Sequence, residues 1–382
     1  MRKTINIGDL GTIITGKTPP TTNKNYYGDY AVFIKPTDIS EQSKYTYETE
    51  EMYSKLAAEK YESSLIPKGA ICVPCIGTIG TKMTMTPCDC YTNQSINSII
   101  CNENYDNEYV YYLIKNFLPG LKAYNLGTAS GREYVSKSNF EKIELVAEQD
   151  KEIQKKIGVI LSRYDSLIEN YQKQIKLLEE AAQRLYKEWF IDLRFPGHEN
   201  TKIVDGVPEG WTPSQLGQLV EFKRGQTITK KDVIDGDIPV VAGGLEPAYY
   251  CNKSNTAERV ITVSGSGANA GFTRMYFEKV WASDCSFVDA STTPFLHFIY
   301  CYLKDNKTTI DNLQKGAAQP HVYAKDINSL SICIPIESVL KSFEEKVSNY
   351  FDTTASLQSQ LRLLTEARDR LLPKLTNGEM EI

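Results

Sequence analysis

Apolar residues recur at intervals of three and four along two long stretches of this chain. The stripe in the first stretch comprises Ile153, Ile157, Ile160, Tyr164, Leu167, Tyr171, Ile175, Leu178, Ala182 and Leu185. The stripe in the second comprises Leu340, Phe343, Val347, Tyr350, Leu357, Leu361, Leu364 and Leu371. This spacing is typical of helices, and of a coiled-coil seam. One such stripe would indicate an ordinary core face, but two matched helices of about 35 residues, each ~50 Å long, are too long for a compact core. The pattern therefore predicts two helices that pack on each other as a spacer.

The two predicted helices belong to an internal repeat. Residues 177–186 align without a gap on residues 363–372, an offset of 186, and six of the ten positions are identical. The same offset pairs Ile157 with Phe343 upstream. Because a repeat of this kind reflects a duplicated structural unit, the second half of the chain is predicted to repeat the first.

Short β-prone runs broken by Gly, Pro, Asn and Ser precede each predicted helix. We therefore expect an α+β protein with two globular domains in tandem, each followed by a long α-helix. The predicted order is a first domain over 1–150, a helix over 151–190, a linker over 191–210, a second domain over 211–335, and a helix with a tail over 336–382. The second helix is expected to stop near its proline, Pro373, with Asn377-Gly378 behind it.

Sparse landmarks relate the two predicted domains. The matched segments are Leu10-Gly11 with Leu216-Gly217, Gly16–Pro19 with Arg224–Thr227, Gly69–Gly80 with Arg259–Gly271, and Gly127–Lys137 with Gly316–Lys325. The sequence between these landmarks has diverged. We infer a scaffold that is duplicated and surfaces that differ.

Composition limits the classes of function. The formal net charge is −5, so this is not a basic protein that binds DNA tightly through phosphate neutralisation alone. Local positive charge or a partner would have to supply that attraction. The first residues lack an apolar signal core and no run approaches the ~18 apolar residues of a membrane span, so we expect a cytoplasmic protein with no membrane segment.

The nine cysteines are expected to be free thiols in a reducing compartment. A zinc site is the alternative, because Cys72, Cys75, Cys88 and Cys90 form a C-x-x-C followed by a C-x-C. The first pair, however, lies in an apolar segment that predicts a buried strand. We therefore expect small buried hydrophobic residues there and no metal.

Several segments, in this order and spacing, resemble the specificity subunits of type I restriction–modification systems. They are Leu185–His198 and Leu371–Glu379 at the two helix ends, with Ile238–Gly244, Gly271–Thr273, Val280–Asp284, Gln319-Pro320 and Ile332–Pro335 in the second domain. The resemblance covers nearly the whole chain.

The resemblance implies a non-catalytic DNA-recognition subunit. Each globular domain would be a target-recognition domain that reads one half of a bipartite, asymmetric double-stranded DNA target through the major groove. The two helices would pair as an antiparallel coiled coil and set the separation of the domains. Two methyltransferase subunits, which would bring S-adenosylmethionine, and restriction subunits would join the complex, and the chain itself would need no cofactor.

Candidate DNA contacts follow from residue type and predicted loop position, although each could equally be a solvated surface group. In the first domain they are Lys17, Thr18, Thr78, Lys82, Gln94, Ser95, Arg132 and Lys137. In the second they are Arg224, Gln226, Ser266, Asn269, Arg274, Gln319, His321 and Lys325. Gly265, Gly267 and Gly271 miss the dinucleotide-binding spacing by one residue, so we expect tight turns there.

Two other classes of function stay open. A DNA adenine methyltransferase would need a Pro-Pro followed by an aromatic residue, whereas Pro19-Pro20 precedes Thr21, and the sequence contains no phosphate-binding P-loop motif. A DNA-modifying enzyme would therefore need an unrecognised catalytic motif. A coiled-coil scaffold that binds only protein would explain the helices but not two divergent globular domains.

Overall fold

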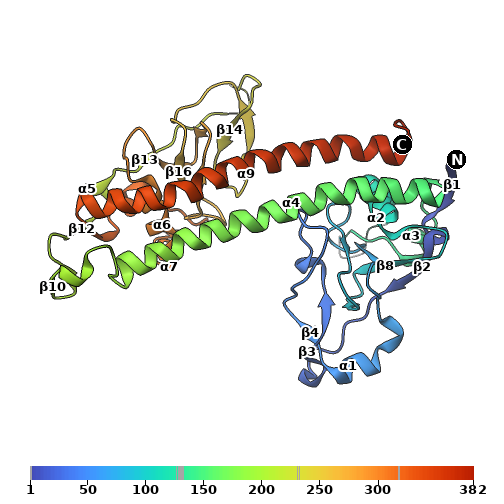
Figure 1. The fold of residues 1–382 in the computed structure, drawn as a ribbon. Coiled ribbons are helices and arrows are strands. Elements are labelled where there is room, and N and C mark those ends of the chain that lie inside the picture. The colour runs from blue at the N-terminus through green and yellow to red at the C-terminus, as the bar shows by residue number, and fades with distance from the viewer. Residues whose placement is uncertain (1, 126, 128–132, 230, 232, 317–318) are drawn as a thin grey trace. The chain divides into compact units, whose positions relative to one another are not determined.

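The computed structural model describes residues 2–125, 127, 133–229, 231, 233–316 and 319–382. Two compact units are present: residues Met1–Gln172 with Gln360–Ile382, and residues Lys173–Ser359. Each unit contains one globular domain and a part of each long helix, which Figure 1 draws in green and red. We call the globular part of the first unit domain 1 and that of the second unit domain 2.

Domain 1 is a mixed α/β domain. Its elements are β1 Arg2–Asn6, β2 Gly11–Thr15, β3 Tyr27–Ile34, β4 Met52–Tyr53, α1 Lys55–Lys60, β5 Ile71–Pro74, β6 Thr84–Met85, β7 Tyr91–Thr92, β8 Ile96–Cys101, α2 Asn107–Phe117, α3 Lys137–Glu141 and β9 Glu144–Glu148. The strands form a four-stranded sheet of order β2-β8-β5-β6, a three-stranded sheet of order β4-β3-β7, and the pair β1-β9.

Domain 2 contains β12 Thr212–Gln215, α5 Leu216–Leu219, β13 Lys223–Arg224, β14 Ile238–Val241, β15 Tyr249–Cys251, β16 Val260–Ser264, β17 Thr273–Tyr276, β18 Trp281–Ala282, β19 Cys285–Asp289, α6 Leu296–Asp305, α7 Lys307–Asn312, α8 Ala324–Asn328 and β20 Ser331–Ile334. Its sheets have the orders β13-β19-β16-β17, β15-β14-β18 and β12-β20, which are those of domain 1 strand for strand. The predicted duplication of the scaffold is thus present in the topology. A short hairpin, β10 Ile203–Val204 with β11 Val207–Pro208, precedes domain 2.

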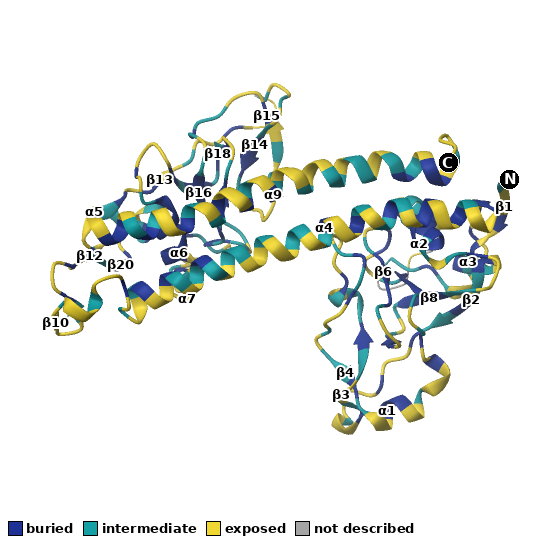
Figure 2. Ribbon diagram, in the orientation of Figure 1, coloured by how far each residue is buried: buried dark blue, intermediate teal, exposed yellow. Residues whose placement is uncertain are grey.

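The central strands form where the sequence is both β-branched and apolar. Every residue of β5 (Ile-Cys-Val-Pro) is buried, and so is every residue of β16 (Val-Ile-Thr-Val-Ser), so both faces of each strand are covered. Figure 2 shows the buried residues gathered in these sheets and in the helices packed on them. The predicted buried strand around Cys72 is confirmed.

The two long helices are α4, Lys151–Tyr186, which continues as a π-helical turn over Lys187–Ile191, and α9, Glu337–Asn377. They begin 186 residues apart, the offset of the sequence repeat. Equivalent stripe positions have equivalent burial, because Ile157 and Phe343 are both fully buried. Leu167 departs from the prediction: it belongs to the stripe by spacing, but it is 42% exposed.

The second helix ends at Asn377, four residues beyond Pro373 and directly before Gly378, because α9 continues through the proline. Proline costs an interior helix one hydrogen bond. Here the neighbouring side chains of Leu372, Leu375 and Thr376 are buried in the core of the first unit. Arg2 also donates to the carbonyl oxygen of Leu375 at 2.9 Å. Tertiary contacts of the last turn therefore outweigh the local preference.

In the part of the chain that the structure describes, no helix combines the length and the apolar character that crossing a bilayer requires.

Candidate nucleic-acid interface

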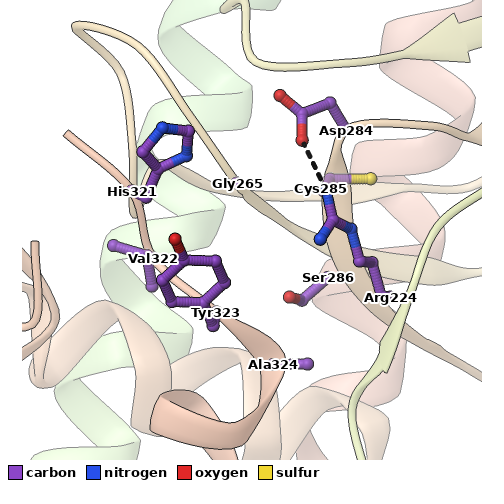
Figure 3. A pocket seen from close by; sticks show the side chains of 9 residues that line it. All are labelled: Arg224, Gly265, Asp284, Cys285, Ser286, His321, Val322, Tyr323 and Ala324. Atoms are coloured by element: carbon purple, nitrogen blue, oxygen red, sulfur yellow. Dashed lines mark ion pairs between the residues drawn. The ribbon is translucent and has the colours of Figure 1, made fainter. Parts of the chain in front are cut away.

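Four segments of domain 2 that are distant in sequence meet at one pocket (Figure 3). They are the end of β13, the turn after β16, the start of β19 and the residues that lead into α8. The pocket is lined by Arg224, Gly265, Asp284, Cys285, Ser286, His321, Val322, Tyr323 and Ala324. Arg224 and His321, both predicted DNA contacts, therefore share one surface.

A charged cluster in this pocket comprises Arg224 and Asp284, which line it, and the neighbouring Ser266. Arg224 Nη2 lies 3.9 Å from Asp284 Oδ1, and Ser266 Oγ donates a hydrogen bond to Asp284 Oδ2. A separation of 3.9 Å exceeds hydrogen-bond range, so the pair is an ion pair without a direct hydrogen bond. The side chain of Arg224 is 70% exposed, which leaves its guanidinium donors available to a ligand.

Backbone hydrogen bonds hold the segments of the pocket in place. The amide of Gly265 donates to Asp284 O at 3.0 Å, and the amide of Val322 donates to Gly265 O at 3.1 Å. The amide of Gly225 donates to Cys285 O at 2.8 Å, and a Cβ there would lie 2.3 Å from Ser283 O. The close approach of two backbones therefore requires glycine at position 225.

Equivalent backbone hydrogen bonds are present in domain 1, and we call this shared set the backbone frame. The amide of Gly16 donates to Ile96 O at 3.2 Å, that of Cys75 to Ser95 O at 2.7 Å, and that of Val135 to Cys75 O at 2.9 Å. A Cβ on Gly16 would lie 2.1 Å from Thr92 O, the counterpart of the close approach at Gly225.

These hydrogen bonds define equivalent positions in the two domains. In the order domain 1 then domain 2, the pairs are Thr15 and Arg224, Lys17 and Gln226, Ile76 and Ser266, Ser95 and Asp284, and Tyr134 and His321. At every one of these pairs the side chains differ in chemistry. A common frame thus presents two different sets of functional groups.

The hydrogen bonds also correct one predicted landmark. The amide of Ile7 donates to Ile143 O, and that of Leu216 donates to Leu330 O. Ile7-Gly8 is therefore the equivalent of Leu216-Gly217, and the predicted match with Leu10-Gly11 is three residues out of register. Domain 1 contains both Ile7-Gly8 and Leu10-Gly11, so the sequence alone does not show which of the two pairs matches Leu216-Gly217.

The predicted contacts of domain 1 lie at the surface to different degrees. The exposed ones are Lys17, Thr18, Thr78, Gln94 and Lys137, and the half-buried ones are Lys82 and Ser95. Thr18 Oγ1 donates to Gln94 Oε1, which brings these two residues together. Lys137 instead lies on α3, where it pairs with Glu141 at 3.6 Å. Arg132 lies outside the described residues.

The predicted contacts of domain 2 also differ in exposure. The exposed ones are Arg224, Gln226, Gln319 and Lys325, and the half-buried ones are Ser266, Asn269, Arg274 and His321. The structure joins Ser266 and His321 by a backbone bridge beside Arg224. Arg274 is held elsewhere: its Nη1 donates to Leu245 O at 2.8 Å and to Glu246 Oε2 at 3.1 Å, and its guanidinium lies 4.8 Å from the ring centre of Tyr276.

Two residues of the pocket were missed from the sequence. Asp284 follows a short apolar strand, and only the sheet register brings it next to Arg224. Tyr323 stacks on His321 with ring centres 5.9 Å apart and an angle of 12° between the rings. Figure 3 shows these two rings across the pocket from Arg224 and Asp284.

The cysteine motif has the character of core packing. Cys72 is buried and lies 3.3 Å from Ser98 Oγ, and burial raises the pKa of its thiol to about 12. Burial likewise raises the pKa of Cys75 to about 12, whereas Cys88 is exposed. Both buried thiols are therefore protonated at neutral pH. Among the described residues, no His, Cys, Asp and Glu side chains form a group of three or more suited to a metal ion.

Comparison with known proteins identifies the class of this duplicated fold. The sequence model of the type I restriction modification DNA specificity domain matches residues 2–180 and 208–364. The chain therefore belongs to the family of type I restriction–modification specificity proteins.

Individual relatives agree with this assignment. The type I restriction enzyme MjaIX specificity subunit of Methanocaldococcus jannaschii is 28% identical, and the alignment covers 98% of this chain and 93% of that protein. The HindI specificity subunit of Haemophilus influenzae is 38% identical over 41% of this chain and 35% of that protein. The crystal structure of an S subunit from M. genitalium has the same fold, with a TM-score of 0.64, 17% identity, and coverage of 98% of this chain and 96% of that one.

Proposed function

We propose that this chain is the DNA-recognition subunit of a type I restriction–modification complex and that it reads a bipartite, asymmetric target. The observation that carries the proposal is the recurrence of one backbone frame in two domains with different side chains at equivalent loop positions. Two copies of one frame would present equivalent surfaces to two stretches of major groove. Their different side chains would then select different base pairs, because each base pair has its own donor and acceptor pattern there.

In this proposal the domains extend over 1–150 and 211–335, the helices over 151–190 and 336–382, and the linker over 191–210. The two helices pair antiparallel as a coiled coil. Two sets of contacts support this: in the first unit Arg368, late in α9, pairs with Asp165, early in α4, and in the second unit Phe343, early in α9, contacts Trp189, which follows α4. A spacer of this kind would set the distance between the half-sites.

The helices are also the proposed docking surface for two methyltransferase subunits. Leu177 is 53% exposed and Leu363 is 58% exposed, and the two are 186 residues apart, so they are the same position of the repeat. Exposed leucines at equivalent positions would give two copies of one partner two similar sites. Restriction subunits would join this complex, whose place is the cytoplasm.

The chain itself contributes recognition and no chemistry. Its net charge of −5 fits a subunit that binds DNA with the help of partners, since phosphate neutralisation provides most of the affinity of a DNA-binding protein. S-adenosylmethionine would belong to the methyltransferase subunits.

Methylome sequencing of cells that express the chain with its methyltransferase tests the proposal. We expect one methylated motif composed of two different specific segments separated by a fixed nonspecific gap. Cells expressing either protein alone should lack the motif. A continuous motif, or methylation by the purified chain alone, would overturn the proposal.

A further inference from the structure

The charged cluster of the domain 2 pocket is not repeated at the equivalent, described positions of domain 1. Arg224, Asp284 and Ser266 occupy the positions that Thr15, Ser95 and Ile76 occupy in domain 1, where the side chains are neutral. The backbone frame does not require these charges, because domain 1 forms the same hydrogen bonds without them. The shared backbone hydrogen bonds therefore do not account for the cluster.

We propose that Arg224, held next to Asp284, reads the guanine of a G·C base pair in the half-site of domain 2. The inference rests on the proposed function, because it assigns a base pair to one of the two recognition surfaces. In the major groove, guanine presents two acceptors, N7 and O6, and the paired cytosine presents a donor, its N4 amino group. A guanidinium beside a carboxylate offers the complementary set, with donors for guanine and an acceptor for cytosine.

The geometry leaves both groups free to make these contacts. The 3.9 Å ion pair does not consume the donors of Arg224, and its side chain is 70% exposed. Asp284 is 39% exposed, and its Oδ2 is already held by Ser266, so the carboxylate has a fixed orientation while Oδ1 faces Arg224. The neighbouring loop is also anchored, since Trp281 Nε1 donates to Gln226 O at 2.7 Å.

The carboxylate argues against a phosphate contact at this place. A phosphate that approached Arg224 would meet Asp284 as a like charge, and such pairs are unfavourable. The major-groove edge of a G·C pair carries no net charge and presents both hydrogen-bond acceptors and a donor. The combination of Arg224 and Asp284 therefore favours a base edge over the DNA backbone.

The test uses the complex of the full chain with its methyltransferase, and compares methylated motifs and binding to oligonucleotide duplexes. The wild-type motif should contain a G·C pair in one half-site. Arg224→Ala and Arg224→Lys should both relax that single position, with discrimination against the other bases falling roughly 10- to 100-fold, and Asp284→Asn should relax the same position. Arg224→Lys keeps the charge and removes the planar fork, so it separates base reading from simple attraction to DNA.

Arg259→Ala is the matched control, because Arg259 also pairs with an aspartate of the second unit, Asp352, but lies outside the pocket. It should leave the motif unchanged. If Arg224→Ala weakens all duplexes equally and lowers the salt slope by about one, Arg224 binds phosphate and the inference is overturned. If the wild-type motif is bipartite but the Arg224 variants leave every position intact, the inference fails alone. If the wild-type complex yields no bipartite motif, the proposed function fails.

Discussion

Arg368 Nη1 donates to Asp165 Oδ1 at 2.6 Å, and this ion pair joins α9 to α4 within the first unit. The side chains are only 12% and 5% exposed. Tyr112 Oη donates to the other oxygen of Asp165, also at 2.6 Å, and Lys115 Nζ lies 3.8 Å away. A buried carboxylate of α4 is thus surrounded by polar groups from α9 and from α2.

The repeat makes this pair informative. The positions 186 residues away are Phe351 and Ala182, both buried in the core of the second unit. The duplication therefore kept the packing positions but made one end polar and the other apolar. A buried charge is tolerated only next to its partner. A helix pairing that placed Asp165 or Arg368 against the apolar equivalents Phe351 and Ala182, within one chain or between two copies, would therefore be unfavourable.

Removing one partner of the pair should be costly. Arg368→Ala leaves Asp165 buried without its main counter-charge, so we expect unfolding of the first unit to become easier by about 3–5 kcal/mol. Urea denaturation of the full chain, followed by hydrogen exchange of α2 and the first turns of α4, measures this. Arg370→Ala is the control, because Arg370 is 81% exposed and should change stability by less than ~0.5 kcal/mol. Equal effects of the two variants would contradict the prediction.

The fold was predictable from the sequence to the extent that a local pattern encodes it. Helical spacing and the repeat located the starts of α4 and α9, because an apolar stripe needs only neighbours along the chain. The helical conformation of Pro373 was not predictable, since the last turn of α9 is held by the burial of Leu375 and Thr376 in the first unit.

The candidate site was predictable only in part. Arg224, Ser266 and His321 were found by residue type near glycine-rich turns. Asp284 was not, because its role depends on a sheet register that places the start of β19 beside the end of β13. The pairing of Ser95 with Asp284 as equivalent positions likewise needed backbone hydrogen bonds, since almost all the sequence between the landmarks has diverged.

The pKa of Glu179, in the second unit, is raised chiefly by burial, which the positive charges of Lys304 and Arg274 offset only in part. When an acidic group has a higher pKa in the folded chain than in the unfolded chain, the folded protein loses stability as the pH rises. The reason is that the group ionises first in the unfolded chain. Glu179→Gln should therefore raise stability at pH 7, and the gain should shrink as the pH falls and disappear below the ordinary glutamate pKa of about 4.3. Thermal unfolding of the wild-type chain and this variant between pH 3.5 and 8 checks the prediction, and a gain that stays constant over this range would contradict it.

Arg2 caps the C-terminal end of α9. Its Nη2 donates to Leu375 O at 2.9 Å and its Nε to Thr376 O at 3.3 Å, so it satisfies carbonyls that have no partner within the helix. Arg2→Ala should increase amide exchange in the last two turns of α9 and lower the stability of the first unit by about 1–2 kcal/mol. Lys3→Ala, an exposed neighbour in the same strand, should leave the exchange unchanged. Unaltered exchange in the Arg2 variant would show that the cap is dispensable.

The two exposed leucines of the repeat test the proposed docking of two methyltransferase subunits. Leu177→Glu or Leu363→Glu alone places a charge in one of the two proposed contacts, so each variant should bind one methyltransferase subunit instead of two. The double variant should bind none. Light scattering of the purified complexes gives the stoichiometry directly. Val159→Glu is the control, because Val159 is also exposed but its repeat partner is the polar residue Glu345. Two bound subunits in both single variants would exclude these positions from the contact.

The length of the helices should determine the gap between the half-sites. One heptad inserted in each helix, after Gln174 and after its repeat equivalent Gln360, preserves the apolar stripe and lengthens each helix by ~10 Å while rotating its face by only ~20°. B-DNA rises ~3.4 Å per base pair, so the gap should grow by about one to three pairs. The added pairs also rotate one half-site around the DNA axis, and twisting the duplex to engage both should cost a few kcal/mol, on the order of 1–6. Methylome sequencing should therefore show a longer gap, weaker methylation and unchanged bases within each half-site. An unchanged gap at full activity, or altered bases in either half-site, would refute the spacer role of α4 and α9.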